Sequence, residues 1–303
     1  MVILAVLEPP DKTVFWVGVF DLGHIPLFGV VMWLTVGTLQ TIRPSMPGSQ
    51  RIGCAFIATI GLGALTEVIQ TLQPTRDASV SDFLRDTAGA GAVALWNGPY
   101  GLRLPVSIAR ARPVLRVLSG ALVAAACLPF VVVLDIYLQR NRSFPVLLRF
   151  DGSRWEARLT SRGRATLEPN KTAPSREADL GPVTLMTMRP GRYSGLVLEE
   201  PYPDWRGYDA LVWTVVSENE SPFVITIRIH DKQHNQRFDD RFNGKFVLRK
   251  GATVITIPLD DIRRAPSGRE LDLSHVRGIA VYAQRLQQPT QIYVSALRLI
   301  PRE

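Results

Sequence analysis

Four ionisable or amide side chains interrupt apolar stretches in the first third of the chain. Glu67 and Gln70 lie near the end of one apolar run, and Asp82 and Asp86 open the next. Residues three or four apart share a helical face, so each pair points in one direction if its segment is helical. An ionised carboxylate in hydrocarbon costs about 2.5–3.5 kcal/mol on insertion scales. Such a group needs a hydrogen-bond donor, and with a raised pKa it can act as a general acid or base.

The available donors are His24, Gln70 and Arg76, and Arg76 or Arg85 can supply the cation that the paired aspartates need. We assign no catalytic residue, but Glu67, His24, Arg76 and Asp82 are the candidates. The sequence predicts that these groups converge on one membrane face as a polar cluster of Asp21, His24, Glu67, Gln70, Arg76, Asp82 and Asp86.

Simpler interpretations stay open for the individual members of this cluster. Asp82 suits the first turn of a helix, where a carboxylate caps free amides and complements the helix dipole. Arg76 is also typical of an interface arginine that extends its charge to water. His24 by itself is typical of an interface histidine. Glu67, inside an apolar run, is the hardest to explain in this way.

The elements that must position these groups are transmembrane helices. A hydrocarbon core about 30 Å thick needs roughly 20 apolar helical residues. We predict spans at 25–42, 52–72 and 114–138, and a shorter segment at 83–97 that either spans with a tilt or is re-entrant. Residues 1–138 are thus expected to form a multi-pass domain, followed by a linker at 139–143 and a water-soluble domain at 144–303.

Positive charge indicates the orientation. Cytoplasmic loops are enriched in Lys and Arg, which places the stretch with Arg103, Arg110, Arg112 and Arg116 inside. Arg140 and Arg142 argue the other way, but they are fewer. We expect the soluble domain outside the cell membrane, with loop 73–81 outside if segment 83–97 spans and inside if that segment is re-entrant.

From Phe144 onward the hydrophobic period changes to two. Nine short runs rich in β-branched and aromatic residues, among them "WEARLTSRG", "FVITIRIHD" and "TVITIPLDD", are separated by Gly, Pro, Asp and Asn turns. This pattern predicts an antiparallel β-sandwich of jelly-roll type. The expected fold class is therefore an α-helical transmembrane bundle followed by that sandwich.

The segments "YSGLVLEEPYPDWRGYDALVWTV", "ITIRIHDKQHNQRFDDRFNGKFVLRKGATVITIPLDDI", "GRELDLSHVRGIAVYAQ" and "QIYVSALRLI", in this order, resemble the galactose-binding-like sandwiches found as carbohydrate-binding modules and in complex I assembly factors. This resemblance implies sugar as a ligand class to consider. Sugar rings are recognised by aromatic faces beside hydrogen-bonding groups, because their C–H faces are apolar and their hydroxyls are not. Further aromatic candidates are Trp155, Tyr193 and Tyr282. The expected ligand-binding set is Trp205, Tyr208, His230, Asp231, His234, Arg237 and Arg241. The alternatives are that Trp205 and Tyr208 only close the sandwich and that "HDKQHNQRFDDRFN" is a solvated hairpin.

The overall charge excludes some partners. The net charge is +8 for 303 residues, but most of the 35 Lys and Arg residues lie after residue 138 and alternate with acids. We therefore expect no nucleic-acid partner. Cys54 and Cys127 lie in apolar runs, so we predict neither a disulfide nor a metal site from them, and no cofactor.

The membrane half resembles the VanZ-like family of small multi-pass membrane proteins over about residues 15–95. The matching pieces are "DLGH" (Asp21–His24), "EVIQ" (Glu67–Gln70), "PTRDASVSD" (Pro74–Asp82) and "DTAGA" (Asp86–Ala90). The family pattern has Lys where this chain has Leu22, and usually Asn near Asp86. The founding member is linked with low-level glycopeptide resistance. The resemblance indicates which proteins are related to this one, but it does not assign a reaction.

For the soluble half, the resemblance to galactose-binding-like sandwiches covers roughly residues 144–301. The resemblance implies a fold and assigns no ligand.

Three functions follow as hypotheses. The leading one is a non-enzymatic cell-envelope protein whose external sandwich binds glycan, a cell-wall component or an envelope protein, with a link to glycopeptide resistance or envelope polysaccharide processes. The second is a membrane-embedded enzyme or proton-handling protein that uses the polar cluster on a lipid-linked or cell-wall substrate. The third is a protein-docking or assembly module.

Overall fold

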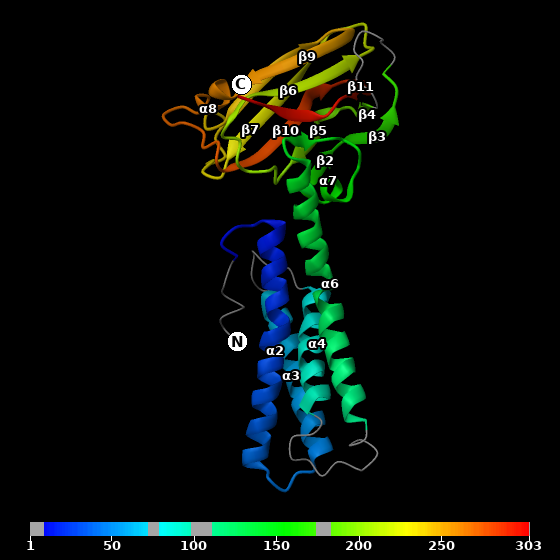
Figure 1. The fold of residues 1–303 in the computed structure, drawn as a ribbon, viewed down its shortest axis with the longest axis vertical. Coiled ribbons are helices and arrows are strands. Elements are labelled where there is room, and N and C mark those ends of the chain that lie inside the picture. The colour runs from blue at the N-terminus through cyan, green and yellow to red at the C-terminus, as the bar shows by residue number, and fades with distance from the viewer. Residues whose placement is uncertain (1–8, 72–78, 98–110, 174–182, 303) are drawn as a thin grey trace. The chain divides into compact units, whose positions relative to one another are not determined.

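The computed structural model describes residues 9–71, 79–97, 111–173 and 183–302. The chain divides into two compact units, Met1–Leu134 and Asp135–Glu303, which are helical and predominantly β respectively (Figure 1). The expected fold class, a helical bundle followed by an antiparallel β-sandwich, is confirmed. Residues 139–143, expected as a linker, are helical.

Among the described residues, three helices are long and apolar enough to cross a membrane: α2 (Val14–Ile42), α3 (Gly48–Gln70) and α6 (Arg112–Ser143), the last of which continues from the first unit into the second. The fourth described helix, α4 (Val80–Asn97), has 18 residues and carries charged side chains in its first two turns. Apolar side chains on these helices are exposed; Trp33 and Ile57 are 55% and 73% exposed. Such a surface is suited to contact with lipid.

Small residues allow the helices of this unit to approach closely, as is common for helices in membranes. A Cβ on Gly89 of α4 would lie 2.1 Å from the carbonyl oxygen of Ile25 on α2. Met32, Val36, Ala55 and Ala90 form the buried core between α2, α3 and α4. The chain direction brings the start of α2, the end of α3 and the start of α4 to one end of the bundle (Figure 1).

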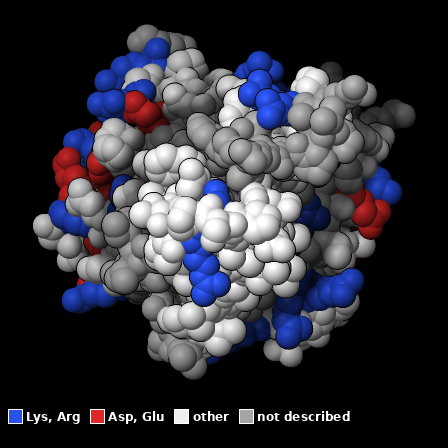
Figure 2. All heavy atoms as spheres, turned by 90° about the horizontal axis from the view of Figure 1, so that it is seen from below, with Lys and Arg blue, Asp and Glu red and all other residues white. Residues whose placement is uncertain are grey.

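The opposite end of the bundle is basic. Arg43 and Arg112 are exposed there, at the end of α2 and the start of α6. Figure 2 looks along the bundle from this end and shows Lys and Arg side chains, without acidic ones, among the uncharged spheres at its centre.

The second unit is built from two antiparallel sheets. One has the order β1-β12-β6-β11-β4-β3, with β9 paired to β6, and the other has the order β2-β5-β10-β7-β8. The strands of the first sheet are β1 (Val146–Leu148), β3 (Ala165–Lys171), β4 (Val183–Met188), β6 (Tyr208–Ser217), β9 (Gly251–Pro258), β11 (Thr290–Val294) and β12 (Leu297–Pro301). Those of the second are β2 (Thr160–Gly163), β5 (Gly191–Leu198), β7 (Phe223–Asp231), β8 (Phe242–Leu248) and β10 (Val276–Leu286).

The sandwich core follows from the period-two pattern, because alternate residues of a strand point to one face. Ile225, Ile227 and Ile229 of β7 are fully buried, and Trp213 of β6 stacks on Phe150 with ring centroids 5.8 Å apart. The intervening residues of β7 therefore point away from the core.

One predicted strand is partly helical. The run "WEARLTSRG" begins with the short helix α7 (Arg154–Leu159) and only then enters β2. Trp155 and Leu159, four apart, are both buried, and the buried Glu156 carboxylate accepts the backbone N–H groups of Arg149 (2.5 Å) and Phe150 (3.1 Å). A strand would also put Trp155 and Leu159 on one face, but it would direct the adjacent Trp155 and Glu156 to opposite faces. The helix allows all three side chains to be buried. A second short helix, α8 (Leu259–Arg263), follows β9.

Candidate functional site

The predicted polar cluster assembles at the end of the bundle where α2 begins. His24 Nδ1 lies 2.8 Å from Asp86 Oδ1, and these side chains are 13% and 1% exposed. Glu67 Oε2 accepts the backbone N–H of Ser79 at 2.7 Å. Gln70 is buried beside Glu67 on α3. Three helices thus supply polar groups to one end of the bundle.

Arg85 supplies the cation of the cluster. Its Nη1 lies 2.5 Å from Asp82 Oδ1, and its Nη2 lies 3.2 Å from Asp21 Oδ2. Arg85 was one of two predicted cations. The other, Arg76, lies outside the described residues, as do Arg103, Arg110 and most of loop 73–81.

Two carboxylate oxygens of this cluster are buried without a hydrogen-bond partner among the described residues, Glu67 Oε1 and Asp86 Oδ2. Asp86 Oδ2 occupies the space above Gly63, where a Cβ would come within 3.1 Å of it. Buried polar atoms in native proteins are nearly always paired, so these two oxygens are free to bind a proton, a water or a ligand.

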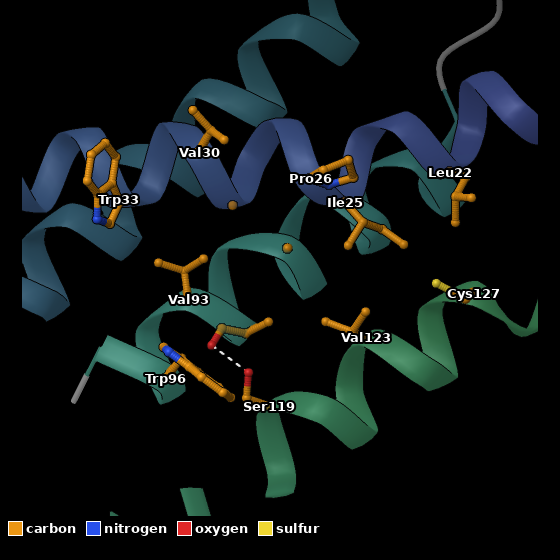
Figure 3. Close-up of a pocket in the computed structure, with 13 residues that line it drawn as sticks. Leu22, Ile25, Pro26, Val30, Trp33, Val93, Trp96, Ser119, Val123 and Cys127 are labelled. Atoms are coloured by element: carbon orange, nitrogen blue, oxygen red, sulfur yellow. Dashed lines mark hydrogen bonds between the residues drawn. The ribbon is translucent and has the colours of Figure 1, made fainter. Parts of the chain in front are cut away.

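An apolar pocket lies between α2, α4 and α6, with a volume of about 630 Å³. The lining residues Leu22, Ile25 and Gly89 lie within one helical turn of His24 or Asp86 along their helices, so this end of the pocket is next to the polar cluster. Figure 3 shows its side chains, including Trp33, Trp96 and Val123, directed into one space, with a hydrogen bond of 2.8 Å from Ser119 Oγ to the carbonyl of Ala92. An apolar cavity beside a polar cluster suits the two ends of an amphiphile.

The residues predicted to bind ligand in the sandwich do not form one site. Trp205 is 0% exposed, so its ring has no free face for a sugar, and its Nε1–H donates to the carbonyl of Tyr202. Tyr208 packs edge-on against Phe144, with ring centroids 5.2 Å apart. Arg237 is exposed and pairs with Asp239 at 3.0 Å. Trp155 is buried in the core.

Asp231 belongs to a buried ion-pair network. Arg269 contacts Asp231 at 2.5 Å and Asp240 at 2.5 Å. The hydrogen bonds from Arg269 and from the Asn235 backbone lower the pKa of Asp240 to about 2. His234 Nδ1 lies 2.9 Å from the carbonyl oxygen of Asp240 and is buried. These groups order the segment between β7 and β8, where the sequence predicted a ligand site.

A groove does lie on the outward face of the five-stranded sheet, with a volume of about 370 Å³. Gly163, Gly195 and Ala280 line it, and these residues from β2, β5 and β10 have small or absent side chains. Tyr193 and Tyr282 also line it; their rings meet edge to face with centroids 5.6 Å apart, and Tyr193 is 52% exposed. The absent side chain of Gly163 leaves room, because the nearest atom to a Cβ there is the carbonyl oxygen of Gly195 at 4.0 Å. At Gly195 the backbone of β10 comes close instead, with the Val281 carbonyl oxygen 2.0 Å from the place of a Cβ.

Arg228 and Arg241 complete the groove. Of the predicted ligand-binding set only Arg241 lines it, together with Tyr193 and Tyr282 from the further aromatic candidates. His230 lies beside it; a Cβ on Gly278 would meet the His230 ring at 2.3 Å. The sequence analysis missed Arg228, because a single arginine within "FVITIRIHD" is the ordinary outward-facing residue of an alternating strand. Only the pairing of β10 with β5 and β7 brings it close to the two tyrosines.

This arrangement can recognise a sugar. Aromatic rings contact the apolar C–H faces of a pyranose, and guanidinium groups donate several hydrogen bonds to its oxygens. Among the described residues no group of three or more His, Cys, Asp or Glu side chains is placed to hold a metal ion.

Comparison with known proteins gives structural likeness only. No family model matches the chain, and no curated protein matches it. A family 11 carbohydrate-binding module from Clostridium thermocellum, in complex with a beta-1,3-1,4-mixed-linked tetrasaccharide, is 18% identical over 47% of this chain and 87% of that one, with a TM-score of 0.35. A family 30 carbohydrate-binding module of a Clostridium thermocellum cellulosomal cellulase is 19% identical over 48% and 91%, with a TM-score of 0.34.

An exo-beta-agarase is also similar, at 14% identity over 48% of this chain, with a TM-score of 0.39. This chain spans 23% of the agarase chain's length. Likenesses at this level assign neither a ligand nor an activity to the protein.

Proposed function

We propose that this protein is a multi-pass membrane protein of the cell envelope that presents a glycan-binding β-sandwich outside the membrane. The observation that carries the proposal is the groove on the five-stranded sheet, where Tyr193 and Tyr282 stand beside Arg228 and Arg241 over a floor of small residues. Three helices of membrane-spanning length support the membrane location. The exposed arginines at the end where α6 begins support that end as cytoplasmic. Because α6 is long enough to cross the membrane, they also support an external sandwich.

The experiment is glycan-array binding by the full chain, purified in a polyoxyethylene detergent, whose head group is not a sugar. We expect Tyr193→Ala and Tyr282→Ala to abolish the binding that the unaltered protein shows. Tyr293→Ala removes a partly buried ring from β11 in the other sheet and is the matched control. If no oligosaccharide binds while the full chain captures an envelope protein, the docking function replaces the glycan function.

A second candidate function is favoured by the unpaired Glu67 Oε1 and Asp86 Oδ2 beside the apolar pocket. In this proposal the pocket holds the chain of a lipid-linked molecule, and the polar cluster meets its head group or exchanges a proton with it. The convergence of Asp21, His24, Glu67 and Asp86 also supports the VanZ-like resemblance, which stays a prediction.

Native mass spectrometry of the chain extracted from membranes tests this candidate. We expect the unaltered protein to retain a bound amphiphile. Both Asp86→Asn, which changes the polar cluster, and Val93→Trp, which fills the pocket, should release it. Val117→Trp places the same ring on an exposed position of α6 and should leave the amphiphile bound. Absence of a retained amphiphile, or retention by both pocket variants, would rule the candidate out.

A further inference from the structure

The charge on the outward face of the five-stranded sheet has one sign. Cross-strand register defines two neighbouring rows on this face. One row is Ser161, Val197, Ala280, Arg228 and Asn243, and the next is Gly163, Gly195, Tyr282, Thr226 and Lys245. Two of these ten residues are basic and none is acidic. Arg241, directly before β8, adds a third cation to the β8 side.

Within the described part of the chain, neither Arg228 nor Arg241 forms an ion pair with a carboxylate, whereas Arg237, Arg269 and Arg302 do so at 2.5–3.0 Å. Arg228 Nε is buried and has no hydrogen-bond partner among the described residues. Burial, followed by the nearby Arg241 guanidinium, lowers the pKa of Arg228 below its ordinary value.

Arg241 is held in place. Its Nε donates to Asn243 Oδ1 at 3.1 Å, and its guanidinium lies over the Phe238 ring, 5.5 Å from the centroid. These contacts leave its terminal N–H groups for a ligand. Because the guanidinium group of Arg241 is oriented before binding, its side chain loses less conformational entropy when it pairs with an oxyanion.

We infer that the groove binds acidic sugars, whose carboxylate or sulfate group lies between Arg228 and Arg241 while a ring packs against Tyr193 or Tyr282. This inference rests on the proposed glycan-binding function and specifies its ligand class. Guanidinium groups match the planar, two-oxygen geometry of such anions with paired hydrogen bonds. A neutral sugar would leave two like charges facing each other without compensation.

His230 contributes no charge to this site at neutral pH. Burial, together with Arg228 and His234, lowers the pKa of His230 to about 4. The attraction for an anion therefore comes from the arginines, with Lys245 at the margin, and we expect affinity for an acidic sugar to change little between about pH 6 and 8.

Matched ligands separate this inference from glycan binding itself. The full chain in polyoxyethylene detergent is titrated with oligogalacturonate and its neutral methyl ester, and with a sulfated galactan oligosaccharide and its desulfated form. We expect the acidic member of at least one pair to bind about tenfold more tightly, and increasing salt to weaken that member alone. Preference within the first or second pair distinguishes a carboxylate ligand from a sulfate ligand.

The variants test the residues. Arg228→Gln and Arg241→Gln should each reduce affinity for the acidic member by about tenfold and change affinity for the neutral member less than about twofold. Arg228→Lys keeps the positive charge but lacks the paired N–H groups of a guanidinium, so its affinity for the acidic member should lie between those of the unaltered protein and Arg228→Gln. Arg298→Gln, an exposed arginine on β12 of the other sheet, is the control.

The outcomes are distinct. Equal binding of acidic and neutral members, or binding that does not depend on either arginine, overturns the acidic-sugar inference and leaves the glycan-binding function standing. If none of the four ligands binds and the glycan array shows no binding either, both the acidic-sugar inference and the glycan-binding function are overturned. Should Arg228→Gln fail to fold, Arg228→Lys and Arg241→Gln decide the inference.

Discussion

Glu156 is a carboxylate that the sandwich buries almost completely, at 1% exposure. Burial raises the pKa of Glu156 from 4.5 to about 7, against the effect of the backbone N–H groups that it accepts. Because the folded protein holds the proton more tightly than the unfolded chain, the stabilisation from protonated Glu156 is complete below pH 4.5. It is lost as the pH rises through 7.

We therefore expect the free energy of unfolding of the sandwich, relative to that of Glu156→Gln, to fall by on the order of 2 kcal/mol between pH 4.5 and 8. Pulse proteolysis of the full chain in urea at several pH values measures this difference. Glu168→Gln, an exposed glutamate on β3, should show no such change. Parallel pH profiles for the unaltered protein and Glu156→Gln would contradict the prediction.

The Arg269 network offers a second comparison between residues. Arg269→Gln leaves Asp231, whose side chain is 0% exposed, without its cation. Removing one partner of a buried pair commonly costs 3–5 kcal/mol, and we expect roughly 2–3 kcal/mol because the guanidinium is partly exposed. Arg237→Gln breaks an exposed pair and should cost less than about 1 kcal/mol. Urea unfolding of both variants gives the difference, and equal losses would refute the network's role.

At the scale of elements, the close contact of α2 and α4 depends on Gly89. Alanine at this position would place a Cβ 2.1 Å from the Ile25 carbonyl oxygen. At Gly120 of α6, no atom of the described residues beyond the neighbouring backbone of α6 itself lies within 4 Å of the corresponding Cβ position. We expect Gly89→Ala to destabilise the bundle by about 1–3 kcal/mol through overpacking. Gly120→Ala should be neutral or slightly stabilising, because alanine favours helix.

Thermal unfolding of the two glycine variants in detergent, followed by circular dichroism, checks this prediction. A Tm for Gly89→Ala at or above that of Gly120→Ala would show that α2 and α4 do not pack as described.

The kind of element was predictable where one pattern governs. The apolar runs correctly indicated long helices at α2, α3 and α6, and alternation indicated strands such as β7 and β9. The boundaries were less predictable, because α2 begins at Val14 and not at residue 25, so that Asp21 and His24 lie within the helix. The sequence did not reveal α7, because "WEARL" is compatible with both periods, and only the structure shows that Trp155 and the adjacent Glu156 are both buried.

At the scale of the whole molecule, the remaining prediction concerns topology. Ser45, in the exposed connection between α2 and α3, and Val254, 63% exposed on β9, are separated along the chain by α3, α4 and α6. If α4 crosses the membrane, the two positions lie on opposite sides; if it is re-entrant, they lie on the same side.

We expect Val254→Cys to react with a membrane-impermeant thiol reagent on intact cells, and Ser45→Cys to react only after permeabilisation. Both are made in a background with Cys54→Ala and Cys127→Ala, which removes the native thiols. Labelling of both positions from outside would show that α4 is re-entrant. Protection of Val254→Cys would contradict an external sandwich.

The sequence by itself determined the division into an apolar helical half and a β-sandwich half, because hydrophobic length and period are local properties. It also singled out Asp21, His24, Glu67 and Asp86, since a charged residue in an apolar run is visible without neighbours. Only the tertiary structure decided the partners, pairing Asp86 with His24 and Asp82 with Arg85.

The groove was likewise decided by tertiary structure. Gly163, Gly195, Ala280, Tyr282 and Arg228 come from four strands, and no local pattern relates them. Strand order and register bring them to one face, because pairing aligns residues far apart in the chain. In the same way the structure placed Trp205 in the core, which decides between the two interpretations that the sequence left open, a ligand contact and closure of the sandwich.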